Sequence, residues 1–78
     1  MPGKGRHTIE ISIASPPDRK DLVAEILVDR EQLAEINREE PILRVEIYPK
    51  PSGGAWLLRF DELMGALEQA RRRLEEIS

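Results

Sequence analysis

Apolar and polar residues alternate strictly in two segments of this chain, and the alternation constrains its fold more than any other feature. In residues 8–14 the apolar positions include Ile9, Ile11 and Ile13, with polar residues between them. Residues 42–48 alternate in the same way. A period of two residues is typical of a strand with one buried and one solvated face. The chain is therefore expected to form a sheet whose apolar face needs a cover.

The last segment has helical spacing instead. Its apolar residues recur at intervals of four, three, four and three, which places them on one face of a helix: Leu63, Leu67, Ala70, Leu74 and Ile77. Asp61 is the candidate N-cap. Two oppositely charged pairs at four-residue spacing would stabilise the helix further: Glu68 with Arg72, and Arg71 with Glu75. The arginine run of this segment therefore needs no ligand to explain it.

Residues 22–38 permit two interpretations. As a helix, the segment is supported by its alanine and glutamate residues and by the prolines upstream of it. As two strands, it consists of a β-branched run over residues 22–28, the charged turn of residues 29–31, and a returning strand. Only Glu25 interrupts the first run, so a surface helix here would be apolar nearly all round. We favour the two strands.

The predicted fold is α+β: an antiparallel β-meander of four to five strands with one C-terminal helix packed on one face. Residues 49–54 contain two prolines and a glycine pair, which indicate a turn, and residues 55–60 are expected to return as a short strand. If residues 22–38 are helical, the order is βαββα. Residues 1–6 are expected to be a flexible arm and residues 7–78 a single domain.

Composition excludes several kinds of chemistry. The chain of 78 residues has no cysteine, which excludes disulfides, thiolate metal sites and a thiol nucleophile. His7, its one histidine, directly follows the N-terminal arm, where an exposed and frayed position is expected. Four carboxylates alternate with apolar neighbours and are expected on the solvated face: Glu10, Glu25, Glu35 and Glu46. We therefore expect no enzyme, no catalytic residue, no metal, no cofactor and no small-molecule substrate.

Charge and hydropathy bear on location and partners. The net charge of −3 opposes phosphate, which argues against a nucleic-acid partner. No apolar run approaches the roughly 20 residues that cross a bilayer, and the N-terminus lacks the apolar core of a secretory signal. We expect a cytoplasmic protein with no membrane association.

Tyr48 and Trp56 stand on either side of the predicted turn, with Arg44 and Arg59 nearby. These four residues are the candidate interaction residues. The two aromatic rings could simply form a cross-strand pair that closes the hairpin. Alternatively, with the two arginines they could form a surface on which the bases of single-stranded nucleic acid stack. The second possibility makes a small nucleic-acid-binding regulator the alternative function.

The width of one helix relative to the sheet indicates a protein partner. A helix with its side chains is about 10–12 Å wide and strands lie about 4.8 Å apart, so one helix covers two to three strands. A sheet of four or five strands would keep part of its apolar face open. We therefore expect a small non-enzymatic protein–protein interaction module that self-associates as a homodimer or binds another protein. The βαββα alternative, with two helices, would remove this expectation.

Residues 45–56, with the sequence VEIYPKPSGGAW, precede the segment FDEL at residues 60–63 and an arginine-rich helix. In these features the chain resembles a group of short uncharacterised bacterial proteins. The resemblance extends to PPDR at residues 16–19 and VAEI at residues 23–26, and so covers nearly the whole chain. It implies a stand-alone small domain with a strand over residues 32–37. It implies no activity.

Overall fold

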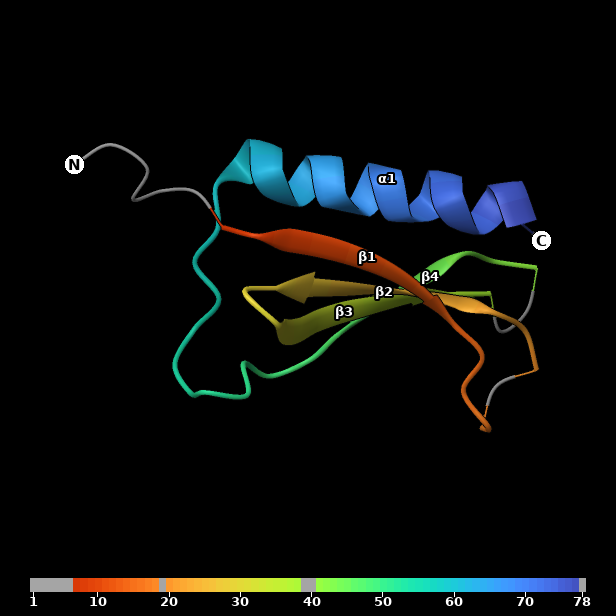
Figure 1. Cartoon of the computed structure of the whole chain (residues 1–78), viewed down its shortest axis with the longest axis horizontal. Coiled ribbons are helices and arrows are strands. Elements are labelled where there is room, and N and C mark those ends of the chain that lie inside the picture. Colours follow the sequence, from red (N-terminus) through yellow and green to blue (C-terminus); the bar gives the residue numbers. More distant parts are fainter. Residues whose placement is uncertain (1–6, 19, 39–40, 78) are drawn as a thin grey trace.

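Four antiparallel strands and one helix make up the computed structural model, which describes residues 7–18, 20–38 and 41–77 (Figure 1). The elements are β1 (Ile9–Ala14), β2 (Val23–Val28), β3 (Glu31–Asn37), β4 (Arg44–Ile47) and α1 (Phe60–Ile77). The strands are neighbours in chain order, β1-β2-β3-β4. The predicted α+β meander with a C-terminal helix is therefore confirmed. The arm expected over residues 1–6 lies outside the described residues.

The two-strand interpretation of residues 22–38 is confirmed as the hairpin β2–β3. Asp29 and Arg30 form its turn, with φ values of 51° and 70°. Two successive left-handed residues give a turn whose twist matches that of the flanking strands. The Asp29 main-chain N–H donates to the Thr8 carbonyl (2.8 Å), and the Thr8 N–H donates to Asp29 Oδ1 (2.9 Å). The turn is thus fastened to the residue before β1.

A register shift in β2–β3 enlarges the core. Leu27 pairs with Gln32 and Ile26 pairs with Ala34, so Leu33 is an extra residue in β3. An extra residue of this kind is a β-bulge, which bends its strand and disrupts strict alternation. Leu33 and its neighbour Ala34 are both buried in the same apolar cluster. The bulge thus allows two consecutive residues to contribute to one core.

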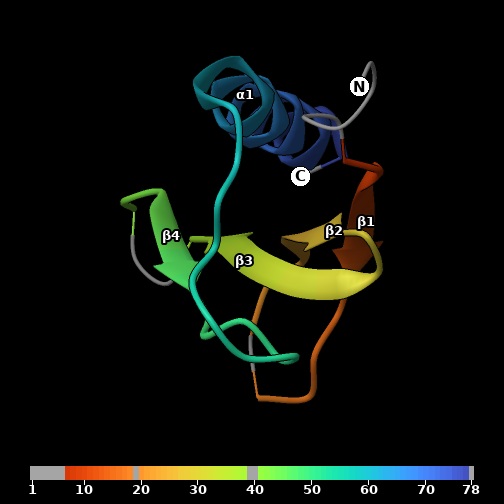
Figure 2. The ribbon, with the colours of Figure 1, turned by 90° about the vertical axis from the view of Figure 1, so that its left-hand side faces the viewer.

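The fifth strand expected over residues 55–60 is wrong. Residues 55–59 form no strand, and the chain passes from the turn to α1 past the end of the sheet (Figure 2). The turn does not lie beside β4, because Ser52 is bound to Glu31 at the β2–β3 turn. Gly53 and Gly54 then redirect the chain with φ values of 95° and 81°. These contacts lead the chain away from the free side of β4.

The helix begins at Phe60, so the prediction of Asp61 as N-cap is wrong: Asp61 lies within the first turn. The predicted pairs of Arg72 with Glu68 (3.7 Å) and of Arg71 with Glu75 (3.1 Å) are confirmed. Ala66, Ala70 and Leu74 are buried against the sheet, while Leu63 and Leu67 are half-buried. Ile77, the last member of the predicted stripe, is 48% exposed.

The helix covers only part of the sheet. It packs on β2 and β1 and touches β3, but among the described residues it does not reach β4. Figure 2 shows β4 at one side of the sheet, beyond the span of α1. One helix therefore covers two to three strands, as its width predicts. In the described part of the chain no helix is long and apolar enough to cross a membrane.

Candidate interaction surface

The helix-side face of β4 is open. Ile36 pairs with Val45 and Ala34 pairs with Ile47, and residues paired across strands project to the same face. Ile36 and Ala34 belong to the core under α1. Val45 and Ile47 therefore project to the helix side as well. Because α1 does not reach them, both are exposed, and the exposed fraction of Ile47 is 63%.

A groove runs between this face and the helix. It has a volume of about 270 Å³ and is lined by Leu33, Ala34, Ile47, Trp56, Leu57, Leu58, Leu63 and Leu67. We call these residues the apolar groove. Leu57, on the segment leading to α1, is 85% exposed. Every lining side chain is hydrophobic, so the groove can bind apolar side chains but has no group for acid, base or nucleophilic chemistry.

Two further apolar side chains of α1 extend the groove toward solvent. Phe60 is 78% exposed, and Met64 is also exposed. Phe60 precedes Leu63 by three residues and Met64 precedes Leu67 by three, so each lies on the same side of the helix as a groove residue. Large apolar side chains grouped beside one another on the surface of a small protein are typical of an interaction site.

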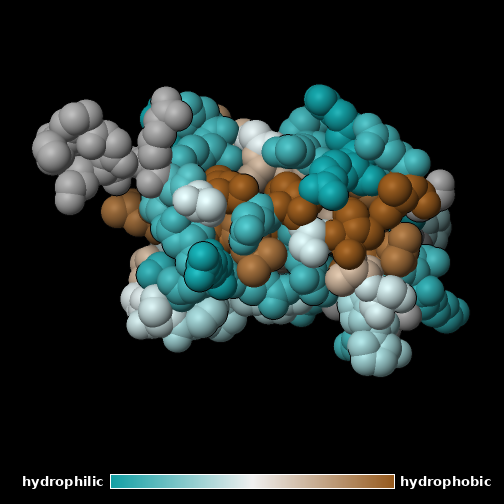
Figure 3. Space-filling model, viewed as in Figure 1, coloured by the Kyte–Doolittle hydropathy of each residue, from teal (hydrophilic) through white to brown (hydrophobic). Residues whose placement is uncertain are grey.

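The outer side of α1 is different in character. Arg71 pairs with Glu68 and with Glu75, and Arg72 pairs with Glu68, all on the helix surface. In the view of Figure 3 this side is hydrophilic, and apolar side chains gather in the band between the helix and the sheet. The arginines are therefore part of a solvated helix face. Bonding to Arg71 lowers the pKa of Glu68, which keeps the pair ionised.

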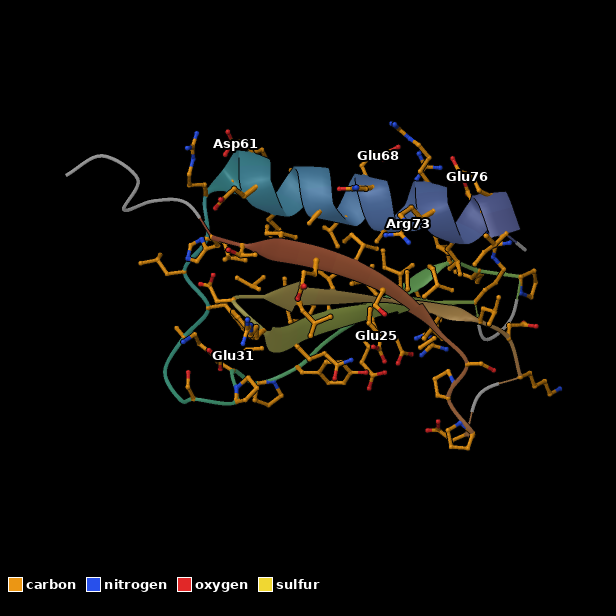
Figure 4. All side chains as sticks on the ribbon, viewed as in Figure 1. Glu25, Glu31, Asp61, Glu68, Arg73 and Glu76 are labelled. Atoms are coloured by element: carbon orange, nitrogen blue, oxygen red, sulfur yellow. The ribbon has the colours of Figure 1, made fainter. Side chains whose placement is uncertain are left out.

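The sheet face away from α1 carries a row of carboxylates. Glu25 pairs with Glu35, and Glu35 pairs with Glu46, so the three lie side by side across β2, β3 and β4. Figure 4 shows Glu25 on the side of the sheet away from α1. The prediction that all are solvated is wrong for Glu35, which is 5% exposed. Its carboxylate accepts hydrogen bonds from Asn37 Nδ2 (3.0 Å) and from the Tyr48 hydroxyl (3.2 Å). Among the described residues no group of acidic or histidine side chains is arranged to hold a metal ion.

The four candidate residues from the sequence do not share one surface. The Tyr48 hydroxyl reaches Glu35 on the polar face, whereas Trp56 packs against the core on the helix side. The Trp56 indole N–H donates to the Tyr48 carbonyl (2.8 Å). The aromatic rings thus lie on opposite faces and offer no common stacking platform.

The two arginines are separate as well. Arg44 is exposed on β4, and Arg59 pairs with Asp61 at the start of the helix (2.9 Å). Lys50, rather than an arginine, lies over the Trp56 ring, 5.8 Å from its centroid. Ile47, Leu57 and Phe60 were not predicted as surface residues from the sequence. The width of one helix predicted that part of the sheet face would stay uncovered, but it did not identify the residues there.

Two carboxylates fasten loops beside the groove. The Ser52 main-chain N–H donates to Glu31 Oε1 (2.8 Å), and this bond is the main reason that the pKa of Glu31 is lowered. The His7 main-chain N–H donates to Glu62 Oε2 (3.0 Å), with the same effect on the pKa of Glu62. His7 Nδ1 is also 3.1 Å from Glu62 Oε1. The expected frayed position of His7 is therefore wrong: it is half-buried and bound to α1.

Comparisons of the chain with protein families, with curated proteins and with solved structures found no match. The resemblance to short bacterial proteins stays a prediction. The apolar groove beside an uncovered strand is the most distinctive feature of the described surface.

Proposed function

We propose that this protein is a small non-enzymatic interaction module that self-associates through the apolar groove and β4. The observation that carries the proposal is the group of exposed apolar side chains that α1 leaves uncovered, above all Ile47 and Leu57. The lack of cysteine fits a reducing compartment, so we place this activity in the cytoplasm.

Burial of these side chains supplies the driving force. Moving a large aliphatic side chain from water into an apolar contact contributes roughly 1.5–3 kcal/mol. Ile47, Leu57 and Phe60 retain most of their surface in the single chain, so a partner can gain most of that contribution. A second copy carries the same side chains and can bury them reciprocally, as two-fold interfaces do.

Sedimentation equilibrium of substituted chains tests the proposal. Ile47→Ser and Leu57→Ser should each weaken self-association by about tenfold or more, because each removes apolar area from the contact. Ile77→Ser is the matched control, since Ile77 is also an exposed aliphatic side chain but lies at the last turn of α1. It should leave association unchanged.

Circular dichroism and thermal unfolding of the variants show whether each stays folded, which is expected because the substituted side chains are exposed. Equal association of all variants would contradict the assignment of the groove. A parent chain that stays monomeric over the whole concentration range would contradict self-association.

A further inference from the structure

The two edges of the sheet are treated differently by the rest of the chain. At the β1 edge, the Arg73 guanidinium donates to the Ile11 carbonyl (2.8 Å), and Figure 4 shows Arg73 between α1 and the sheet. The Thr8 carbonyl points toward Asp29, next to β2. Because main-chain groups of successive residues point alternately toward and away from the neighbouring strand, those of Ile9, Ile11 and Ile13 point away from β2. Arg73 thus occupies an outward carbonyl and protects this edge from pairing.

The described residues give the β4 edge no such protection. The Tyr48 N–H donates inward to the Leu33 carbonyl (2.9 Å), so alternation directs the main-chain groups of Val45 and Ile47 outward. Within the described residues nothing hydrogen-bonds to these groups. An exposed strand edge with apolar side chains is a template for another strand.

We infer that β4 pairs antiparallel with β4 of a second copy across a two-fold axis, which joins the two sheets into one. This inference rests on the proposed self-association and specifies its geometry. Antiparallel pairing by a two-fold axis places the helix-side faces of both sheets on the same side of the joined sheet. Apolar residues of one β4 must therefore lie opposite apolar residues of the other.

Charge selects the register. With Val45 opposite Val45 of the second copy, Arg44 lies opposite Glu46 of the second copy, and Leu43 lies opposite Ile47. If the two-fold axis passed beside Arg44 instead of Val45, Arg44 would lie opposite Arg44 of the second copy. If it passed beside Glu46, Glu46 would lie opposite Glu46. Like charges directly opposite one another are destabilising. The order Arg44-Val45-Glu46 is therefore complementary to its own two-fold copy.

The same register accounts for the open groove. The axis is perpendicular to the sheet, so both helices lie on the same side of the joined sheet. Val45 and Ile47 of the two copies then form one apolar strip between the helices, and each copy's groove lies along it. This continuity explains why the uncovered residues are on the helix side of β4 and not on its acidic side.

Single-cysteine variants test the pairing, and the lack of native cysteine makes the readout unambiguous. Residues directly opposite in a hydrogen-bonded pair have Cα atoms about 5.5 Å apart, within the range that a disulfide bridges. Val45→Cys should therefore give a cross-linked dimer on non-reducing gels faster than Arg44→Cys or Glu46→Cys. Ser12→Cys, exposed on β1, is the control and should cross-link only slowly.

The outcomes separate this inference from the proposed function. If the chain has dimer mass but Glu46→Cys or no position cross-links fastest, the proposed function stands and the register is wrong. If the parent chain is monomeric, both fail. Fast cross-linking at Val45 alone supports both.

Charge exchange gives an independent readout. Arg44→Glu and Glu46→Arg should each raise the dissociation constant about three- to tenfold, because each places like charges opposite one another. The double variant should restore the parent value, because the opposite pairing is re-formed in reverse. Failure of the double variant to improve on both single variants would overturn the pairing.

Discussion

Asp29 and Arg30 turn the hairpin β2–β3 with left-handed backbones, although neither is glycine. A left-handed conformation costs about 1–2 kcal/mol for a residue with a side chain. Hydrogen bonds of Asp29 with Thr8 offset that cost at the first position. Arg30 has no comparable bond to the main chain among the described residues.

Arg30→Gly is therefore expected to stabilise the protein. Glycine removes the energetic cost of the left-handed backbone, and this gain exceeds the extra conformational entropy that glycine loses on folding. The free energy of unfolding should therefore rise by up to about 1 kcal/mol. The shift of the urea midpoint measures it. Asp21→Gly, where the backbone is not left-handed, should give no gain. A lower midpoint for Arg30→Gly would contradict this interpretation of the turn.

Glu62 links stability to pH. Hydrogen bonds from His7 lower its pKa below its usual value of 4.5. A lowered pKa in the folded state stabilises the protein above pH 4.5, and this contribution is lost as the pH falls through the folded value. Glu62→Gln should therefore reduce stability at pH 7 and flatten its decline below pH 5, which thermal unfolding across pH measures. An unchanged decline would show that this carboxylate is not linked to folding.

Residue-level features were the least predictable from sequence. Glu35 alternates with apolar neighbours just as a solvated residue does, and its burial depends on Tyr48, which follows β4. The extra residue Leu33 in β3 has no local signature, because the bulge depends on pairing with β2. Both outcomes are set by contacts between distant segments, and these are not encoded in the period of one strand.

At the scale of elements, periodicity predicted two strands and the helix, and composition favoured the two strands of residues 22–38. Neither predicted the extent of the contacts between these elements. The helical stripe from Leu63 to Ile77 is regular in sequence, yet only its central part packs tightly on the sheet. The segment at residues 55–59 has strand-like composition but is not paired, since the Glu31–Ser52 bonds determine where the turn lies. Composition alone does not reveal such a tether.

Leu74 and Ile77 form a matched pair on α1. Leu74 is buried and Ile77 is 48% exposed. Leu74→Ala should reduce the free energy of unfolding by about 2–5 kcal/mol, because it creates a cavity in the core. Ile77→Ala should change it by no more than about 0.5 kcal/mol. Similar effects of the two substitutions on chemical denaturation would mean that the helix packs differently from the described arrangement.

For the whole molecule, the ratio of one helix to four strands determines which surface stays open. The width of a helix predicted an uncovered part of the sheet, and the structure identifies that part as β4 and its neighbours on the helix side. The candidate residues Tyr48, Trp56, Arg44 and Arg59 were chosen by residue type, which does not reveal the face to which a side chain projects. Only Arg44 belongs to the pairing that we infer.

The most direct test of this account is the mass of the unmodified chain in solution, measured by light scattering during size-exclusion chromatography at micromolar concentration. The account predicts twice the chain mass of 8.9 kDa, falling toward a single mass on dilution. A mass of 8.9 kDa at every concentration would contradict it.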